Sequence, residues 1–147
     1  VIREFEFSSG AVVVSSGGIG GNHELVRNHW PEHLPAAPEH MLSGVPAHVD
    51  GLMLGIAEQA GAALINGDRM WHYTEGITNS APVWPKHGIR SLPGPSSLWL
   101  DATGHRMPPP ALPGFDTLGT LEQILKTGFD HSWFVRRVQP VDATPGF

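Results

Sequence analysis

Hydrophobic and polar positions follow strand-like patterns at the start of the chain. Residues 1–7 (VIREFEF) alternate with the two-residue period of a half-buried strand. Residues 11–14 (AVVV) form a continuous apolar run, which is typical of a strand buried on both faces of a parallel sheet. Glycines then occupy four of the five positions 17–21, and residues 23–30 predict a short helix that ends before Pro31.

The best helical pattern in the chain covers residues 50–61. It follows a loop at residues 31–48 that contains four prolines. Asp50 is a suitable N-cap, apolar residues recur after it at helical spacing, and Gly61 can end the helix. The apolar residues 63–65 then predict an extended segment.

The second half of the chain mixes strands with one further helix. Residues 74–96 show no clear period. Residues 97–107 (SLWLDATGHRM) predict a β-hairpin around an Asp-Ala-Thr-Gly turn, and residues 132–138 (SWFVRRV) predict a final strand.

The helix predicted between them covers residues 120–128. Thr120 and Gln123 have the spacing of a capping box at its start, and Gly128 provides its exit.

Composition changes near residue 66, so we divide the chain there. The expected fold class is α/β plus α+β. Residues 1–65 predict the end of an α/β layer, and residues 66–147 predict a smaller mixed unit.

Composition and charge exclude several classes of protein. Hydrophobic residues make up 40% and charged residues 16% of the 147 residues, which is enough apolar material for a core. The net charge of −5, with nine scattered Lys and Arg, disfavours nucleic acid or an anionic membrane surface as partner. No apolar run is long enough to span a bilayer, and the N-terminus does not resemble a signal peptide. The absence of cysteine excludes disulfides and thiolate sites and fits a reducing compartment, so we expect a cytoplasmic protein.

The glycine turn at residues 17–21 allows two interpretations. Counted from Gly18, the third glycine of a G-x-G-x-x-G dinucleotide fingerprint would fall on His23, so the fingerprint fails. A strand that ends in small residues still exposes backbone amides where ligands of α/β sheets bind. The alternative is a turn whose glycines are purely steric.

The nine histidines do not predict a metal site. His29 and His33 are four residues apart, but Pro31 between them prevents a regular helix from bringing them to one face. Without cysteine or an H-E-x-x-H pattern, we expect no bound metal.

The densest chemical cluster is residues 70–76 (MWHYTEG). His72 beside Tyr73, close to a carboxylate, has the composition of a proton-transfer site. The alternative is an aromatic core segment whose polar tips find partners. Arg90 could hold an anionic group, and a solvated loop is the alternative for that residue.

Four motifs, in the same order, resemble a family of flavoproteins that includes the soluble fumarate reductases and 3-ketosteroid dehydrogenases. The segment GAVVVSSGGIGGNHELV is similar to that family's AVVLATGGFGGN, and VDGLMLGIAEQAGAAL lies where the family has a Gly-Asp-Gly turn and a helix ending in Ala-Gly-Ala. The segment SSLWLDATGHRM is similar to the family's AIVVNREGNRF hairpin, and DHSWFV to the strand SAWLIFD. The chain most resembles the group called FAD-binding dehydrogenases.

The resemblance implies a Rossmann-like FAD-binding domain interrupted by a small capping domain. Residues 1–65 would belong to the FAD domain and residues 66–147 to the cap. The family's N-terminal G-x-G-x-x-G has no counterpart here, and the chain begins within a strand pattern, so we expect an internal fragment that is inactive alone. The expected partners are the remainder of the FAD domain and a small-molecule substrate, and surfaces exposed by truncation would allow homo-oligomers.

The resemblance also implies site residues. Ser15, Ser16, Gly17 and Gly18 lie where the family's chain passes close to FAD. Asp50 matches an Asp that helps to hold the cofactor in the family.

His72 falls within about one residue of the substrate histidine of the fumarate reductases, by the same correspondence. With Tyr73 and Arg90 it is our candidate for proton or substrate chemistry. The fumarate reductases' Arg proton donor after the hairpin is absent from residues 108–119 (PPPALPGFDTLG), which argues against dicarboxylate reduction.

The expected function is therefore part of an FAD-dependent oxidoreductase that acts on carbon–carbon bonds. A stand-alone structural or protein-interaction domain without catalytic activity is the alternative.

Overall fold

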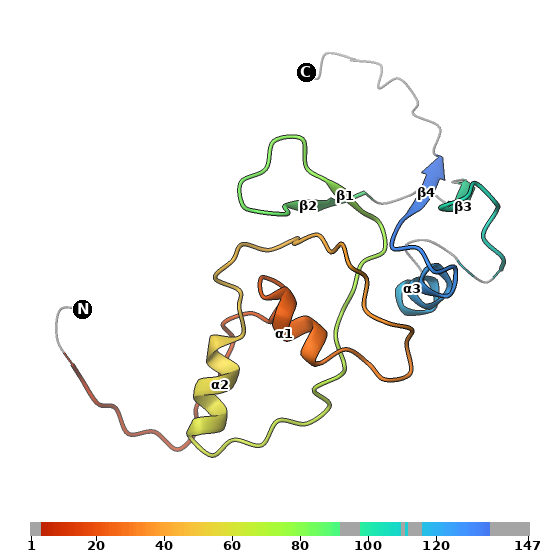
Figure 1. The fold of residues 1–147 in the computed structure, drawn as a ribbon. Coiled ribbons are helices and arrows are strands. Elements are labelled where there is room, and N and C mark those ends of the chain that lie inside the picture. The colour runs from red at the N-terminus through yellow and green to blue at the C-terminus, as the bar shows by residue number, and fades with distance from the viewer. Residues whose placement is uncertain (1–3, 92–97, 110, 112–115, 136–147) are drawn as a thin grey trace, which may run out of the picture.

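The computed structural model describes residues 4–91, 98–109, 111 and 116–135 (Figure 1). In these ranges the order of elements is α1 (His23–Asn28), α2 (Leu52–Gln59), β1 (Gly76–Thr78), β2 (Gly88–Arg90), β3 (Leu98–Asp101), α3 (Thr117–Lys126) and β4 (Ser132–Val135). Figure 1 shows α1 and α2 within long loops in one part of the molecule, and α3 with β3 and β4 in another. Both sheets of the described residues are two-stranded and antiparallel, β1 with β2 and β3 with β4.

A hydrophobic cluster of buried residues lies where α3 packs on the β3–β4 sheet. Trp99 of β3 is 4% exposed and packs with Met107 and Ile124. The predicted hairpin around residues 101–104 is present, because Asp101 N donates to His105 O at 2.7 Å and Met107 N donates to Trp99 O at 3.0 Å. The expected mixed α+β character of the second half is therefore confirmed.

The helix α3 begins earlier than the sequence predicts. Asp116 is the N-cap, and its carboxylate accepts from Gly119 N at 2.9 Å. Thr120, expected in a capping box, instead lies fully buried inside the helix. The exit at Gly128 is as predicted, with a left-handed φ of 79°.

The hairpin β1–β2 occurs in residues 74–96, where no pattern was visible. Gly76 pairs with Arg90, Ile77 with Ile89 and Thr78 with Gly88. Strands of three residues are too short to display a period of two, and the residues that support this hairpin come from elsewhere in the sequence.

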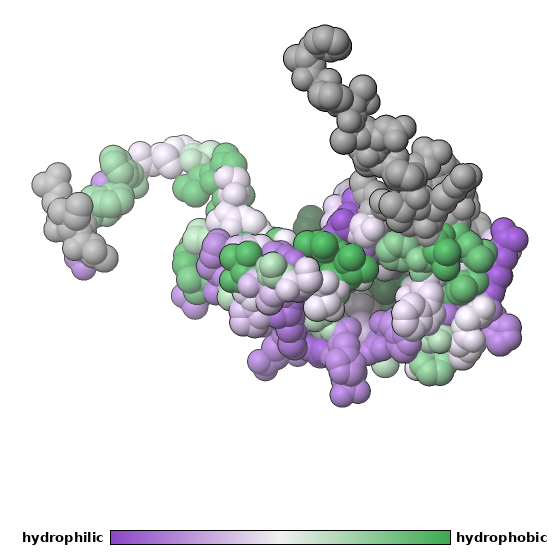
Figure 2. Space-filling view, turned by 90° about the horizontal axis from the view of Figure 1, so that it is seen from above, coloured by the Kyte–Doolittle hydropathy of each residue, from purple (hydrophilic) through white to green (hydrophobic). Residues whose placement is uncertain are grey.

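The strands expected at the N-terminus are not formed in the described residues. Residues 4–14 are extended but pair with no other strand of the described residues. They form an arm that extends away from the rest of the molecule (Figures 1 and 2). The side chains of Phe7 and Val13 are 85% and 88% exposed. An alternating or apolar pattern becomes a strand only when a neighbour completes its backbone hydrogen bonds, and no described segment pairs with this arm. The Rossmann-like layer is therefore not confirmed, and residues 1–3 of the predicted first strand lie outside the described ranges.

The elements that follow the glycine turn match the sequence more closely. Asn22 caps α1 by accepting from Leu25 N at 3.0 Å. Gly51, with a φ of 83°, takes the N-cap position of α2 that was expected for Asp50, although the Asp50 carboxylate does accept from Leu52 N at 3.0 Å. Gly61 follows this helix with a φ of 89°. The segment 63–65 is extended but unpaired.

None of the described helices has the length and apolar character that a membrane crossing requires.

We predict that Gly21→Ala destabilises the protein. A Cβ at this position would lie 2.7 Å from Pro46 O and 2.9 Å from Val49 O, so the loop must move and the bond from Gly21 N to Val49 O (2.8 Å) must weaken. The expected loss is about 1–3 kcal/mol of unfolding free energy, measured as a lower melting temperature. Gly10→Ala is the matched control, because a Cβ there meets nothing within 4 Å. Equal melting temperatures for the two variants would contradict this packing.

Candidate functional site

The bend Ser15–Gly18 presents exposed main chain with only small side chains. All four residues are exposed, and none of their backbone N–H groups donates to another described residue. Gly17 has a left-handed φ of 96°, which side chains rarely adopt. Unpaired N–H donors beside side chains no larger than that of serine suit a polar, nucleotide-like ligand.

The structure requires glycine at some positions of the turn and not at others. A Cβ on Gly20 would lie 3.1 Å from a Val45 methyl, and Gly21 is crowded by the carbonyls of residues 46–49. Gly18 has nothing within 4 Å of a Cβ and no positive φ. The steric interpretation therefore accounts for Gly20 and Gly21, and ligand contact at residues 15–18 stays a prediction. Nothing in the described structure requires a glycine at position 18.

Asp50 lies next to this bend. Its neighbour Val49 would contact a Cβ on Gly17 at 3.1 Å, and Asn22 Nδ2 donates to Asp50 O at 3.4 Å. One carboxylate oxygen of Asp50 is already used by Leu52 N. The residues that the family resemblance implies for the cofactor site, Ser15–Gly18 and Asp50, therefore lie in one region of the structure.

Ser43 connects the glycine turn with the β1–β2 hairpin. Its hydroxyl lies 2.7 Å from His23 Nε2 and donates to Gly20 O at 3.4 Å. Its backbone N donates to Lys86 O at 2.8 Å, and its carbonyl accepts from Gly88 N at 3.0 Å. Burial, together with nearby Lys86 and Arg27, lowers the pKa of His23, which favours the neutral ring in this contact.

Two of the predicted catalytic residues, Tyr73 and Arg90, meet beside this hairpin. The guanidinium carbon of Arg90 lies 4.0 Å from the centre of the Tyr73 ring, which is a cation–π arrangement. Arg90 Nη2 also donates to Glu75 Oε1 at 3.3 Å. Glu75 is fully buried, and its Oε2 has no partner among the described residues.

His72 lies against a different aromatic side chain. Its ring centre is 5.2 Å from that of Trp30, and its Nε2 is buried without a partner in the described part of the chain. Burial lowers the pKa of His72 below the usual 6.5, so the neutral ring is favoured at neutral pH. A neutral imidazole with an unpartnered nitrogen can accept or release a proton.

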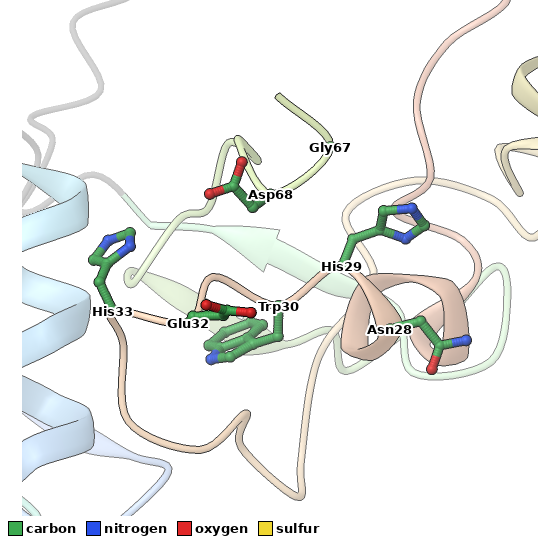
Figure 3. A pocket seen from close by; sticks show the side chains of 7 residues that line it. All are labelled: Asn28, His29, Trp30, Glu32, His33, Gly67 and Asp68. Carbon is green, nitrogen blue, oxygen red and sulfur yellow. The ribbon is translucent and has the colours of Figure 1, made fainter. Parts of the chain in front are cut away.

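Trp30 also lines a pocket of about 490 Å³ (Figure 3). The pocket carries two imidazoles and two carboxylates, and its lining residues are Asn28, His29, Trp30, Glu32, His33, Gly67 and Asp68. Within the described ranges no group of three or more His, Asp or Glu is arranged to hold a metal ion.

A second pocket of about 470 Å³ lies between the proline-rich loop and the end of α3. His40 Nδ1 and Asp130 Oδ2 are 2.7 Å apart at its edge. Hydrogen bonds from His40 and His131 lower the pKa of Asp130 to about 2. This contact fastens the loop to the second half of the molecule.

Sequence reasoning missed three residues of this region. Glu75 stood in the cluster of residues 70–76, but only the fold shows that its carboxylate meets Arg90. Trp30 and Ser43 lie in segments that predict a helix end and a loop, and no local signal marks their contacts with His72 and Gly88.

Comparison with known proteins identifies the class. The family model described as the FAD binding domain matches residues 2–138. The chain therefore belongs to the FAD-binding domain family, and the flavoprotein resemblance seen in its motifs is confirmed. FAD is the cofactor that this membership assigns to the full-length protein.

The relatives found among curated proteins are described as steroid dehydrogenases. A KsdD-like steroid dehydrogenase of Mycobacterium tuberculosis is 64% identical over 141 residues, which is 96% of this chain and 25% of the relative. A KsdD-like steroid dehydrogenase of Mycolicibacterium smegmatis is 67% identical over 135 residues, covering 92% of this chain and 25% of the relative. The chain thus spans about a quarter of the length of the relatives it matches. No solved structure matches it.

We predict that the His72 ring titrates below pH 6.5, and that Trp30→Ala raises the midpoint toward 6.5. Burial disfavours the charged ring, and removal of the indole exposes it to water. Between the lowered pKa and 6.5 the unfolded chain binds more protons, so stability rises with pH in that window. NMR titration of the ring C–H signals measures the midpoint.

The matched control is Trp71→Ala, which removes an 82% exposed indole from the neighbouring residue. A midpoint at or above 6.5, or an equal shift in both variants, would contradict the proposed cause.

Proposed function

We propose that the full-length protein is an FAD-dependent dehydrogenase that forms or reduces a carbon–carbon double bond in a steroid. The observation that carries the proposal is the 64–67% identity, over almost the whole chain, to proteins described as KsdD-like steroid dehydrogenases. Family membership favours this function over a stand-alone interaction domain. The 147 residues alone, without the remainder of such a protein, are expected to be inactive.

The bend Ser15–Gly18, together with Asp50, would hold part of the FAD. Its exposed amides and the open space at Gly18 fit a group that approaches the main chain closely. FAD, when bound, accepts a hydride from a substrate carbon. The residues of the bend bind and orient the cofactor, and the small side chains keep the approach clear.

His72, Tyr73 and Arg90 would serve the substrate. The neutral His72 ring can take or return a proton at Nε2, its buried nitrogen. Arg90, stacked on Tyr73, offers a fixed positive charge to a substrate oxygen. Tyr73 and Arg90 are in contact, and His72 directly precedes Tyr73 in the chain, which supports a common role.

We also propose that residues 1–65 belong to the FAD domain and residues 66–147 to a capping domain. The separate hydrophobic cluster of α3 and the β3–β4 sheet supports an independent second unit. The arm at residues 4–14 and the helix α2, which buries no residue, would pack on the remainder of the FAD domain. A second copy of the chain is the other partner that these apolar surfaces would accept.

Reduction of the flavin by a steroid tests the function. The purified full-length protein is expected to carry FAD and to lose its yellow colour when a saturated steroid ketone is added without oxygen, because the flavin is reduced as the substrate is oxidised. An artificial electron acceptor should restore the colour. A flavoprotein that no steroid ketone reduces, and whose reduced form no unsaturated steroid reoxidises, would contradict the proposed substrate class.

Substitution of Gly18 tests the cofactor site. Gly18→Leu is expected to weaken FAD binding by about tenfold or more, or about 1.4 kcal/mol, without lowering the melting temperature of the FAD-free protein. Nothing in the described structure opposes a side chain there, so the loss would come from the ligand. Gly10→Leu adds the same side chain to an equally open position before the bend and should leave FAD affinity unchanged. Equal FAD affinity in all three proteins would place the cofactor elsewhere.

A further inference from the structure

Glu75 has an unusual environment for an acidic residue. Its side chain is fully buried, yet its only ion pair in the described residues is a single contact of 3.3 Å with Arg90. The second oxygen has no partner there. Burying a carboxylate costs several kcal/mol, and one long contact returns little of that cost. Stability therefore does not account for a carboxylate at this position.

The contact instead restrains Arg90. The β1–β2 ladder fixes the two backbones, because Gly76 pairs with Arg90 and Ser91 N donates to Glu75 O at 2.9 Å. Glu75 then holds one nitrogen of the guanidinium, and Tyr73 covers a face of it. A guanidinium held at two points has lost most of its freedom before any ligand arrives.

The restrained guanidinium is still accessible. The side chain of Arg90 is 35% exposed, whereas that of Glu75 is not exposed at all. Among the described residues, the hydrogen bond to Glu75 uses one of its five N–H donors. The remaining donors form a planar positive edge, which is suited to an oxygen atom that carries negative charge.

We propose that Arg90 binds the substrate oxygen on which negative charge develops, and that Glu75 and Tyr73 are positioning residues for its guanidinium. The inference rests on the proposed dehydrogenase function. When a proton leaves the carbon next to a ketone, it passes to a protein base, and the electron pair of the broken C–H bond moves toward the ketone oxygen. Arg90 stabilises this oxygen anion, whereas it interacts weakly with the uncharged ketone.

Binding of substituted phenols tests the role of Arg90 without any turnover. Phenols of similar shape and different acidity compare a neutral oxygen with an anionic one at a fixed pH. Calorimetry on the full-length protein with bound FAD should show that the phenolate binds about tenfold or more tightly than the neutral phenol. Arg90→Met should abolish this preference and leave the affinity for neutral phenol unchanged.

The control variant is Lys86→Gln, which removes a positive charge from the loop of the same hairpin. It should keep the full preference for phenolate. An unchanged phenolate preference in Arg90→Met would overturn the proposal. An equal loss of preference in Lys86→Gln would also overturn it, because the preference would then depend on the overall charge of the hairpin and not on Arg90.

The role of Glu75 requires its own variants. Glu75→Gln should reduce the phenolate preference while FAD content, melting temperature and neutral phenol affinity stay the same. In the double variant Glu75→Gln/Arg90→Met the first change should have no further effect, because no guanidinium is left to position. Additive losses, or an unchanged preference in Glu75→Gln, would show that Glu75 does not act through Arg90.

Two further measurements keep the test decisive. If Glu75→Gln does not fold, Tyr73→Leu examines the same restraint from the other side of the guanidinium, and an unchanged preference there overturns the positioning role. Steroid-dependent flavin reduction is recorded in parallel. If the wild-type protein prefers phenolate but steroids do not reduce its flavin, the proposed function is contradicted and the role of Arg90 is retained. If steroids reduce the flavin but phenolate is not preferred, the role of Arg90 is contradicted and the proposed function is retained.

Discussion

Polar contacts of Ser43 hold the glycine turn and the β1–β2 hairpin together. Its hydroxyl contacts His23 and Gly20 on the side of the glycine turn, and its backbone N and carbonyl bond to Lys86 and Gly88 on the side of the hairpin. The residue is 6% exposed, so these bonds form away from water, where an unpaired partner would be costly. The indole of Trp84 adds a further bond to the same carbonyl at 3.0 Å. Ser43 therefore fixes the glycine turn relative to the hairpin, although few side chains are buried among the described residues.

The two regions that Ser43 joins differ in electrostatic character: one presents uncharged backbone groups and the other charged side chains. The bend at residues 15–18 offers neutral backbone donors in an open setting. The hairpin side concentrates charge, with a fully buried carboxylate next to a partly exposed guanidinium. A neutral cradle suits a large polar cofactor, whereas a fixed charge suits a single atom whose charge changes during a reaction. This division gives the proposed cofactor and substrate roles a physical basis beyond the order of motifs.

Local signals in the sequence predicted those elements whose causes are local. The hairpin around residues 101–104 follows from its turn, and the ends of α2 and α3 follow from Gly61 and Gly128, which adopt positive φ. The strand at residues 11–14 could not be confirmed, because a strand needs a neighbour and none is present in the described ranges. The Glu75–Arg90 ion pair could not be predicted from the sequence either, because it depends on a hairpin whose strands are too short to show an alternating hydrophobic pattern. The cofactor roles expected for residues 15–18 and Asp50 came instead from the family resemblance, whereas their closeness is seen only in the structure.

The contact between His40 and Asp130 has a consequence for the order of folding. It joins residues 90 positions apart. Closing so long a loop costs more chain entropy than closing a turn, so this link forms only after the nearby hairpins and helices have shortened the effective path. Shorter-range bonds, such as those from Arg27 to Pro38 O and Glu39 O, already hold the same loop near α1. The His40–Asp130 contact is therefore expected to add the connection to the second half of the chain late in folding, at the edge of the second pocket.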